Sequence, residues 1–91
     1  MVFTHKQNTR MENRKFQEAL GERIKRIRLE KNMSQTLLAE HCGIEKANLS
    51  RIESGQANPT VLTLLKISAA MQVPVVEFFK YEVKDSAVPA V

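Results

Sequence analysis

The sequence has few of the residues that build covalent or catalytic sites. It contains one cysteine, two histidines, one tyrosine and no tryptophan in 91 residues. Cys42 has no partner for a disulfide within the chain, a pattern expected in a reducing cytoplasm. His41 adjoins it, but the only other histidine is His5, so we predict no metal site and no cofactor. The sequence also shows no glycine-rich phosphate loop and no nucleophile–base pair, and we predict that the protein is not an enzyme.

Long apolar runs are missing as well. No stretch approaches the roughly 20 apolar residues that a membrane span needs, and the N-terminus is polar and basic without an apolar signal core. The composition is 43% apolar and 26% charged, which is ordinary for one small globular domain. We therefore expect a cytoplasmic protein that makes no membrane contact. A domain this small buries a modest core, which dimerisation would supplement.

The positive charge is concentrated near the N-terminus. The net charge is +4, and residues 1–15 carry four lysines and arginines against one glutamate. Residues 16–31 carry five against three, residues 32–55 carry two against three, and the rest of the chain is balanced. A basic protein favours polyanions through counterion release, although an ordinary solvated surface explains this value equally well.

Apolar residues recur at helical spacing over most of the chain, which predicts an all-α fold. Residues 1–13 lack this period and are predicted to be a flexible basic arm, which either follows DNA or is simply disordered. Residues 14–81 are predicted to form the domain, and residues 82–91 a flexible tail. Five helices are expected, over about 14–31, 34–42, 45–54, 60–71 and 75–80. Their inward residues are predicted to include Phe16, Leu20, Ile24, Ile27, Val61, Leu64, Ile67, Met71 and Phe78, with Arg23 on the exposed face of the first helix.

Residues 34–54 are predicted to form two short helices joined by an abrupt bend. Ser34 can accept hydrogen bonds from free N–H groups of the first turn and so act as an N-cap. Gly43 can take the left-handed conformation that ends a helix and turns the chain. In the second of these helices Leu49 and Ile52 point inward. The remaining positions then point outward: Lys46, Ala47, Asn48, Ser50 and Arg51.

This layout resembles the phage-repressor-like (Xre/Cro) helix-turn-helix proteins, and the short chain also resembles restriction–modification controller proteins. The resemblance implies a compact five-helix lambda-repressor-like domain with the helix-turn-helix at its second and third helices. It also implies a transcription regulator that binds double-stranded DNA, as a homodimer on a palindromic operator, in an autoregulatory circuit. The matching residues are Gly21 to Ile24, Ile27, Arg28, Gln35, Leu38, Ala39, Gly43, Ile44, Leu49, Ile52 to Gly55, Pro59, Thr60, Leu64, Leu65, Ile67 and Met71 to Val73.

Side-chain chemistry suggests how the third helix would read DNA. Arg51 and Lys46 can donate to guanine, Ala47 can meet a thymine methyl group, and Ser50 can reach a base. Backbone contacts are expected from Asn48 and from Gln56 and Asn58 through the N–H groups of their loop. The resemblance implies a phosphate contact for Gln35 and a structural ion pair between Arg28 and Glu53.

Apolar residues near the C-terminus are candidates for protein contacts. Leu62, Leu65, Val76 and Phe79 are predicted to form a dimer interface, as family members often dimerise through this end, although an intramolecular seam would also explain them. Acidic residues on the surface are candidates for contact with RNA polymerase, namely Glu40, Glu45 and Glu77. The alternative function is an antitoxin-type module that holds a toxin partner through exposed Leu37, Leu62 or Phe79 and binds its own promoter.

Overall fold

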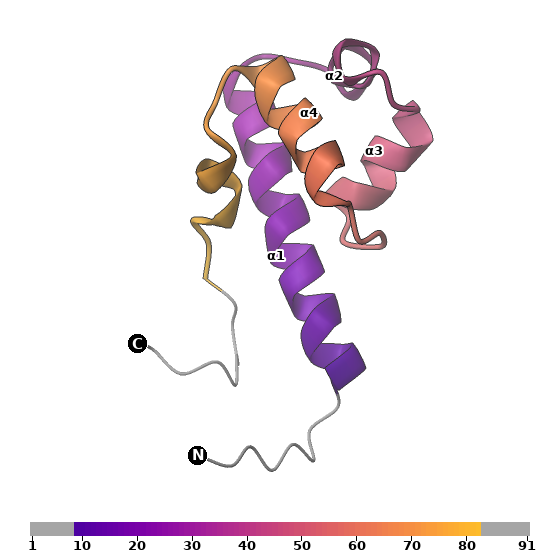
Figure 1. Cartoon of the computed structure of the whole chain (residues 1–91), viewed down its shortest axis with the longest axis vertical. Coiled ribbons are helices and arrows are strands. Elements are labelled where there is room, and N and C mark those ends of the chain that lie inside the picture. Colours follow the sequence, from indigo (N-terminus) through magenta and orange to yellow (C-terminus); the bar gives the residue numbers. More distant parts are fainter. Residues whose placement is uncertain (1–8, 83–91) are drawn as a thin grey trace.

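The computed structural model describes residues 9–82, all of whose regular elements are helical. They are α1 (Thr9–Glu30), α2 (Gln35–Cys42), α3 (Lys46–Glu53), α4 (Val61–Met71) and the short η1 (Val75–Phe79) (Figure 1). The predicted all-α class with a helix-turn-helix at the second and third helices is confirmed. The fifth element is a 3₁₀ helix rather than an α-helix. It follows Pro74, whose carbonyl accepts from the Glu77 N–H at 3.0 Å, and it is too short to add α-helical turns.

The first helix begins at Thr9, earlier than predicted, so residues 9–13 of the predicted arm are helical. Apolar periodicity marks only the part of a helix that packs on a core, and it is absent from these first turns. Their residue types nevertheless favour a helix, since arginine, methionine and glutamate are strong helix formers. The remaining predictions for the arm and the tail concern residues 1–8 and 83–91, which lie outside the described residues.

Two N-caps match the prediction. The Leu37 N–H donates to Ser34 Oγ at 3.0 Å, and the Thr63 N–H donates to Thr60 Oγ1 at 3.1 Å. Each hydroxyl satisfies a backbone donor that the first turn of the following helix leaves free. The starts of α2 and α4 are therefore fixed locally by the sequence.

The bend after α2 is also the one expected at Gly43. This residue has φ +72°, and the Ile44 N–H returns to the Ala39 carbonyl at 3.1 Å while the Gly43 N–H returns to Glu40. This pair of bonds is the Schellman motif, which needs a left-handed residue after the helix. The same pattern closes the other α-helices at Asn32, Gly55 and Gln72, all with positive φ.

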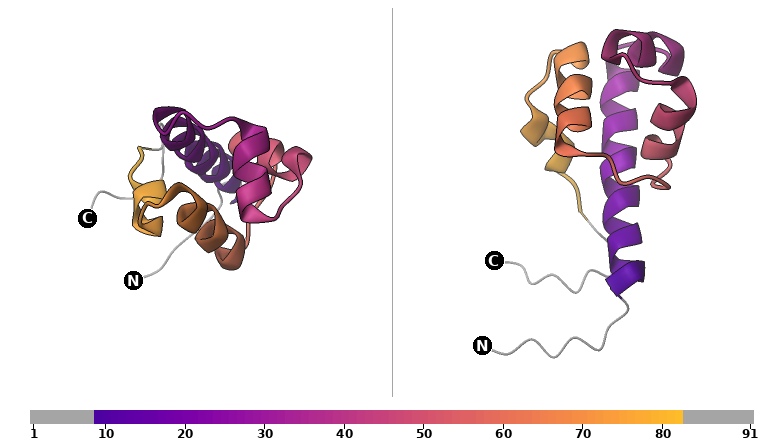
Figure 2. Two further views of the ribbon diagram at one scale, coloured as in Figure 1. Left: turned by 90° about the horizontal axis from the view of Figure 1, so that it is seen from above. Right: turned by 45° about the vertical axis from the view of Figure 1, so that its right-hand side comes forward.

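The core lies between all five elements: α1 packs on α3 and η1, α2 packs on α3 and α4, and α4 packs on η1 (Figure 2). Phe78, Ile24 and Leu49 are fully buried. Phe16 and Leu20 are only half-buried, and Leu20 packs against the edge of the core. The prediction for Val61 is wrong: it is 70% exposed, at the very start of α4. The other buried apolar residues are Ile27, Leu38, Ala39, Cys42, Ile52, Leu64, Ile67 and Met71.

Candidate nucleic-acid interface

The outer face of α3 is polar and open to solvent. Leu49 and Ile52 anchor the helix, with 0% and 2% of their surface exposed. Asn48 was expected to point outward but is half-buried, because it lies one turn before Ile52 on the same face. The four residues predicted to read bases are all exposed, namely Lys46, Ala47, Ser50 and Arg51. All four side chains are therefore accessible to a ligand from solvent.

A buried ion pair holds the C-terminal end of α3 against α1. Arg28 Nε donates to Glu53 Oε2 at 2.7 Å, and Arg28 Nη2 donates to Glu53 Oε1 at 3.1 Å. The two side chains are only 7% and 2% exposed. Arg28 Nη1 also donates to the Met33 carbonyl at 2.7 Å, so the guanidinium ties the end of α1 into the same cluster. The structure therefore contains the predicted Arg28–Glu53 pair, with the bidentate geometry that favours arginine.

Gln35, the predicted phosphate contact, also belongs to this cluster. Its Nε2 donates to Glu53 Oε1 at 2.8 Å, and the residue is half-buried. A glutamine amide has two N–H donors and an acceptor oxygen, so a second donor remains for a phosphate. The sequence does not indicate this bond, because the partners are 18 positions apart and belong to different helices. Glu53 thus joins the start of α2, the end of α3 and the last turns of α1.

Two glycines bring α1 and the end of α3 into close contact. A Cβ atom at Gly21 would overlap the Ile52 carbonyl oxygen and lie 2.6 Å from that of Glu53. A Cβ at Gly55, where φ is +81°, would lie 2.6 Å from Glu18 Cα. No side chain fits at either point. Both glycines match the family in sequence, but this close packing was not predicted. Its only signal is Gly21, a glycine inside an otherwise regular helix.

The loop after α3 presents the other predicted backbone contacts. Gln56 and Asn58 are both exposed. One detail of the prediction is wrong: the Gln56 N–H is not free for a phosphate, because it donates to the Arg51 carbonyl at 2.8 Å and so caps α3. A phosphate contact by Gln56 would have to come from its side-chain amide.

Comparison with known proteins identifies this arrangement. Residues 24–78 match the model of the HTH_3 family, described as helix-turn-helix. The chain belongs to this helix-turn-helix family. It is 38% identical over 72 residues to the HTH-type transcriptional regulator SutR of Escherichia coli K12, a match that covers 79% of this chain. It is 46% identical over 57 residues to the HTH-type transcriptional regulator SinR of Bacillus subtilis 168, covering 62% of this chain. The chain spans only 39% and 51% of those two relatives.

Solved structures with the same helix-turn-helix fold include restriction–modification controller proteins. C.AhdI from Aeromonas hydrophila superposes with a TM-score of 0.67 and 29% identity, over 68% of this chain and 94% of that one. C.Esp1396I superposes with a TM-score of 0.66 and 34% identity, over 71% of this chain and 86% of that one. The protein therefore contains the helix-turn-helix DNA-binding domain that transcriptional regulators carry.

Away from α3, the helix-turn-helix domain exposes apolar side chains on α4 and η1, two elements that contact each other. Leu62 is 70% exposed, and Val76, Phe79 and Leu65 are 55%, 49% and 43% exposed. Val61, predicted to be inward, adds a fifth apolar side chain. Within the described residues these side chains are not an intramolecular seam, so that alternative is wrong. We refer to these five residues as the α4–η1 patch.

The other side of α1 contains a contact that the sequence did not reveal. Arg23, predicted to be exposed, donates from Nε to the Glu77 carbonyl at 2.8 Å and from Nη2 to Glu77 Oε1 at 3.2 Å. Lys80 Nζ donates to Glu77 Oε2 at 2.7 Å, and this bond, with the nearby Arg23 charge, lowers the pKa of Glu77. The Glu77 carboxylate is therefore paired with both Arg23 and Lys80. Glu40 and Glu45 are exposed.

Cys42 is a buried core residue. Burial raises the pKa of its thiol, although the charge of Lys66 partly opposes the shift. Among residues 9–82 no cluster of three or more histidine, cysteine, aspartate or glutamate side chains could hold a metal ion. In the same part of the chain, no helix is both long and apolar enough to cross a membrane.

Proposed function

We propose that the protein is a transcription regulator that binds double-stranded DNA in a sequence-specific way, with α3 in the major groove. The observation that carries the proposal is the two-sided character of α3. Its inner face is buried and clamped to α1 through Glu53, while its outer face presents exposed polar side chains. The major groove is about 12 Å wide, which admits one α-helix with its side chains directed at the base edges.

The roles proposed for individual residues follow from their chemistry. Arg51 donates two hydrogen bonds to guanine, Lys46 donates to guanine or a phosphate, and the methyl group of Ala47 contacts thymine. Ser50 reaches a base edge. The duplex backbone is held by the side chains of Gln35, Asn48 and Gln56 and by the N–H groups of the loop at Asn58. These contacts position the helix, and the base contacts select the sequence.

The test is an Arg51→Ala variant. Arg51 is exposed, so its loss should leave folding intact, while binding to a selected site weakens by about 1–3 kcal/mol and preference relaxes at one base pair. The site is found by selecting duplexes from a random pool with the unaltered chain, and affinities are measured by fluorescence anisotropy. Gln56→Ala is the matched control, since loss of a backbone contact weakens all sequences alike. Equal losses on selected and random duplexes for Arg51→Ala would contradict its role.

We further propose that two copies bind as a homodimer through the α4–η1 patch, on half-sites about 34–36 Å apart. In a symmetric dimer both protomers bury the same patch, and the burial of apolar surface supplies the free energy of association. Leu62→Arg is expected to raise the dimer dissociation constant at least about tenfold, measured by sedimentation. Leu29→Arg is the control, because Leu29 is 55% exposed but lies on α1. A chain that stays monomeric at high micromolar concentration and on DNA would refute the dimer.

The autoregulatory role is the last part of the proposal. It is supported by the likeness to controller proteins, whose chains this one covers by 94% and 86%. Binding of the protein to the DNA upstream of its own gene would be the direct test. The antitoxin alternative and a contact with RNA polymerase stay predictions of the sequence.

A further inference from the structure

The first turns of α1 extend beyond the rest of the domain. In both Figure 1 and the right panel of Figure 2, the indigo end of α1 continues past the loop that joins α3 to α4. The helix has 22 residues, which corresponds to about 33 Å. The backbone of α1 therefore continues past the loop that follows α3, the loop proposed to meet the DNA backbone.

Arg14 lies on the side of α1 that faces this loop. Glu18 touches Gly55 so closely that a Cβ on the glycine would lie 2.6 Å from Glu18 Cα. Arg14 is one turn earlier on the same face, and its Nε lies 3.4 Å from Glu18 Oε2. The next residue of the loop is Gln56, which is exposed. Arg14 thus lies on the face of α1 that packs on this loop, one turn nearer the N-terminus than the Glu18–Gly55 contact.

We propose that Arg14 donates hydrogen bonds to a backbone phosphate adjacent to the one met by the Gln56–Asn58 loop, and so extends the DNA footprint. This inference rests on the proposed function. A guanidinium matches the oxygen atoms of a phosphate, and the ion pair with Glu18 is 57% and 54% exposed, so solvent screens it and it yields easily to a new partner. Arg14 lies outside residues 24–78, so the family match assigns it no role.

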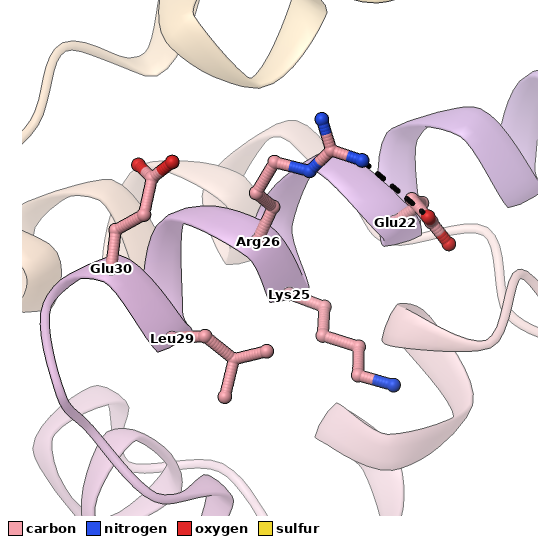
Figure 3. A pocket seen from close by; sticks show the side chains of 5 residues that line it. All are labelled: Glu22, Lys25, Arg26, Leu29 and Glu30. Carbon is pink, nitrogen blue, oxygen red and sulfur yellow. Dashed lines mark ion pairs between the residues drawn. The ribbon is translucent and has the colours of Figure 1, made fainter.

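Glu18 should oppose this contact, since its carboxylate both occupies Arg14 and repels phosphate. The chain offers a matched control in a second i,i+4 pair on the same helix. Arg26 Nη2 lies 3.8 Å from Glu22 Oε1, and the two side chains are 63% and 71% exposed (Figure 3). Arg26 lines a hollow with Tyr81 and Glu82, on the η1 side of α1. Arg26 therefore has the same charge as Arg14 and a similar exposure, but it lies on the η1 side of α1.

The experiment compares Arg14→Gln, Arg26→Gln and Glu18→Gln in the full chain, bound to a duplex selected by the unaltered protein. Arg14→Gln is expected to weaken binding about threefold to tenfold and to reduce the slope of log affinity against log salt by about 1 per bound chain. Glu18→Gln is expected to strengthen binding about twofold to threefold, as removing a like charge near phosphate should. Arg26→Gln should change neither quantity beyond the small effect of one distant charge.

A second measurement identifies the phosphate itself. Duplexes carrying a single neutral methylphosphonate are scanned across the site, and the position whose neutralisation weakens the unaltered chain but not Arg14→Gln is the one that Arg14 contacts. The phosphate contacted by Arg14 should be next to the phosphate whose neutralisation no longer weakens binding of the Gln56→Ala variant. Circular dichroism of each variant verifies that it is folded.

Two outcomes would overturn the inference. If Arg14→Gln and Arg26→Gln lose the same affinity and the same salt slope, only overall charge matters. If no methylphosphonate position loses its effect in Arg14→Gln, the arginine meets no particular phosphate. In either case binding that still depends on Arg51 leaves the proposed function standing, whereas an unaltered chain that binds no duplex would refute the proposed function itself.

Discussion

Replacing Arg28 by alanine is expected to lower the free energy of unfolding by about 3–5 kcal/mol. The reason is that the substitution leaves the buried Glu53 carboxylate without a positively charged partner. Glu53 is 2% exposed at its side chain, and without the guanidinium it would keep Gln35 as a hydrogen-bond donor but no opposite charge. The Met33 carbonyl would also lose a donor at 2.7 Å. Since small domains have about 5–15 kcal/mol of stability in all, this is a large share, and urea unfolding followed by circular dichroism would measure it.

A paired replacement separates charge from packing in this prediction. The double variant Arg28→Met with Glu53→Leu removes both charges and fills similar volume, and such exchanges are often neutral or stabilising. The double variant should therefore be more stable than Arg28→Met alone. If both single and double variants lose the same amount, the loss comes from packing and the account of an unpaired buried charge is wrong.

Gly21→Ala is expected to lower the free energy of unfolding, although helix propensity alone predicts an increase. On helix propensity alone, alanine inside α1 would stabilise the helix by up to about 1 kcal/mol. The structure predicts the opposite, because the new methyl group would overlap the carbonyl oxygen of Ile52 and lie 2.6 Å from that of Glu53. Both oxygens belong to backbone, which cannot rotate away as a side chain can. Overpacking of this kind costs about 1–3 kcal/mol and sometimes more.

The same substitution should also impair DNA binding, since relief of the overlap requires α3 to move away from α1. Thermal unfolding and DNA affinity are therefore measured together for Gly21→Ala. Glu22→Ala is the control on the neighbouring, exposed position of the same helix. A Gly21→Ala protein that is as stable as the unaltered chain and binds DNA equally well would show that α1 and α3 are not packed as described.

The features predicted correctly from the sequence depend on neighbours in the chain. Ser34 and Thr60 cap helices whose first turns they precede, and Gly43 ends the helix it follows. Periodicity identified the buried faces of α2 and α3. The buried face of α3 is enough to predict that Lys46 and Arg51 are exposed. The Arg28–Glu53 pair was expected only because the chain resembles a known family.

The features that were missed depend on how distant segments approach each other. Arg23 and Glu77 are 54 positions apart, and nothing near either residue indicates the other. The overlap at Gly21 depends on the crossing of α1 and α3, a property of the assembled helices. Val61 was misplaced because periodicity gives a direction around a helix but does not tell where the covering elements end.

The cluster around Glu53 has a consequence for how such a protein changes its target. Glu53 connects α1, α2 and α3 from beneath the face of α3 proposed to read DNA, and these hydrogen bonds involve none of the outward side chains of α3. Mutations at those outward positions can therefore accumulate without loosening the scaffold. Under the proposed function, a lineage built on this frame is free to drift from one operator to another, one side chain at a time, while remaining folded throughout.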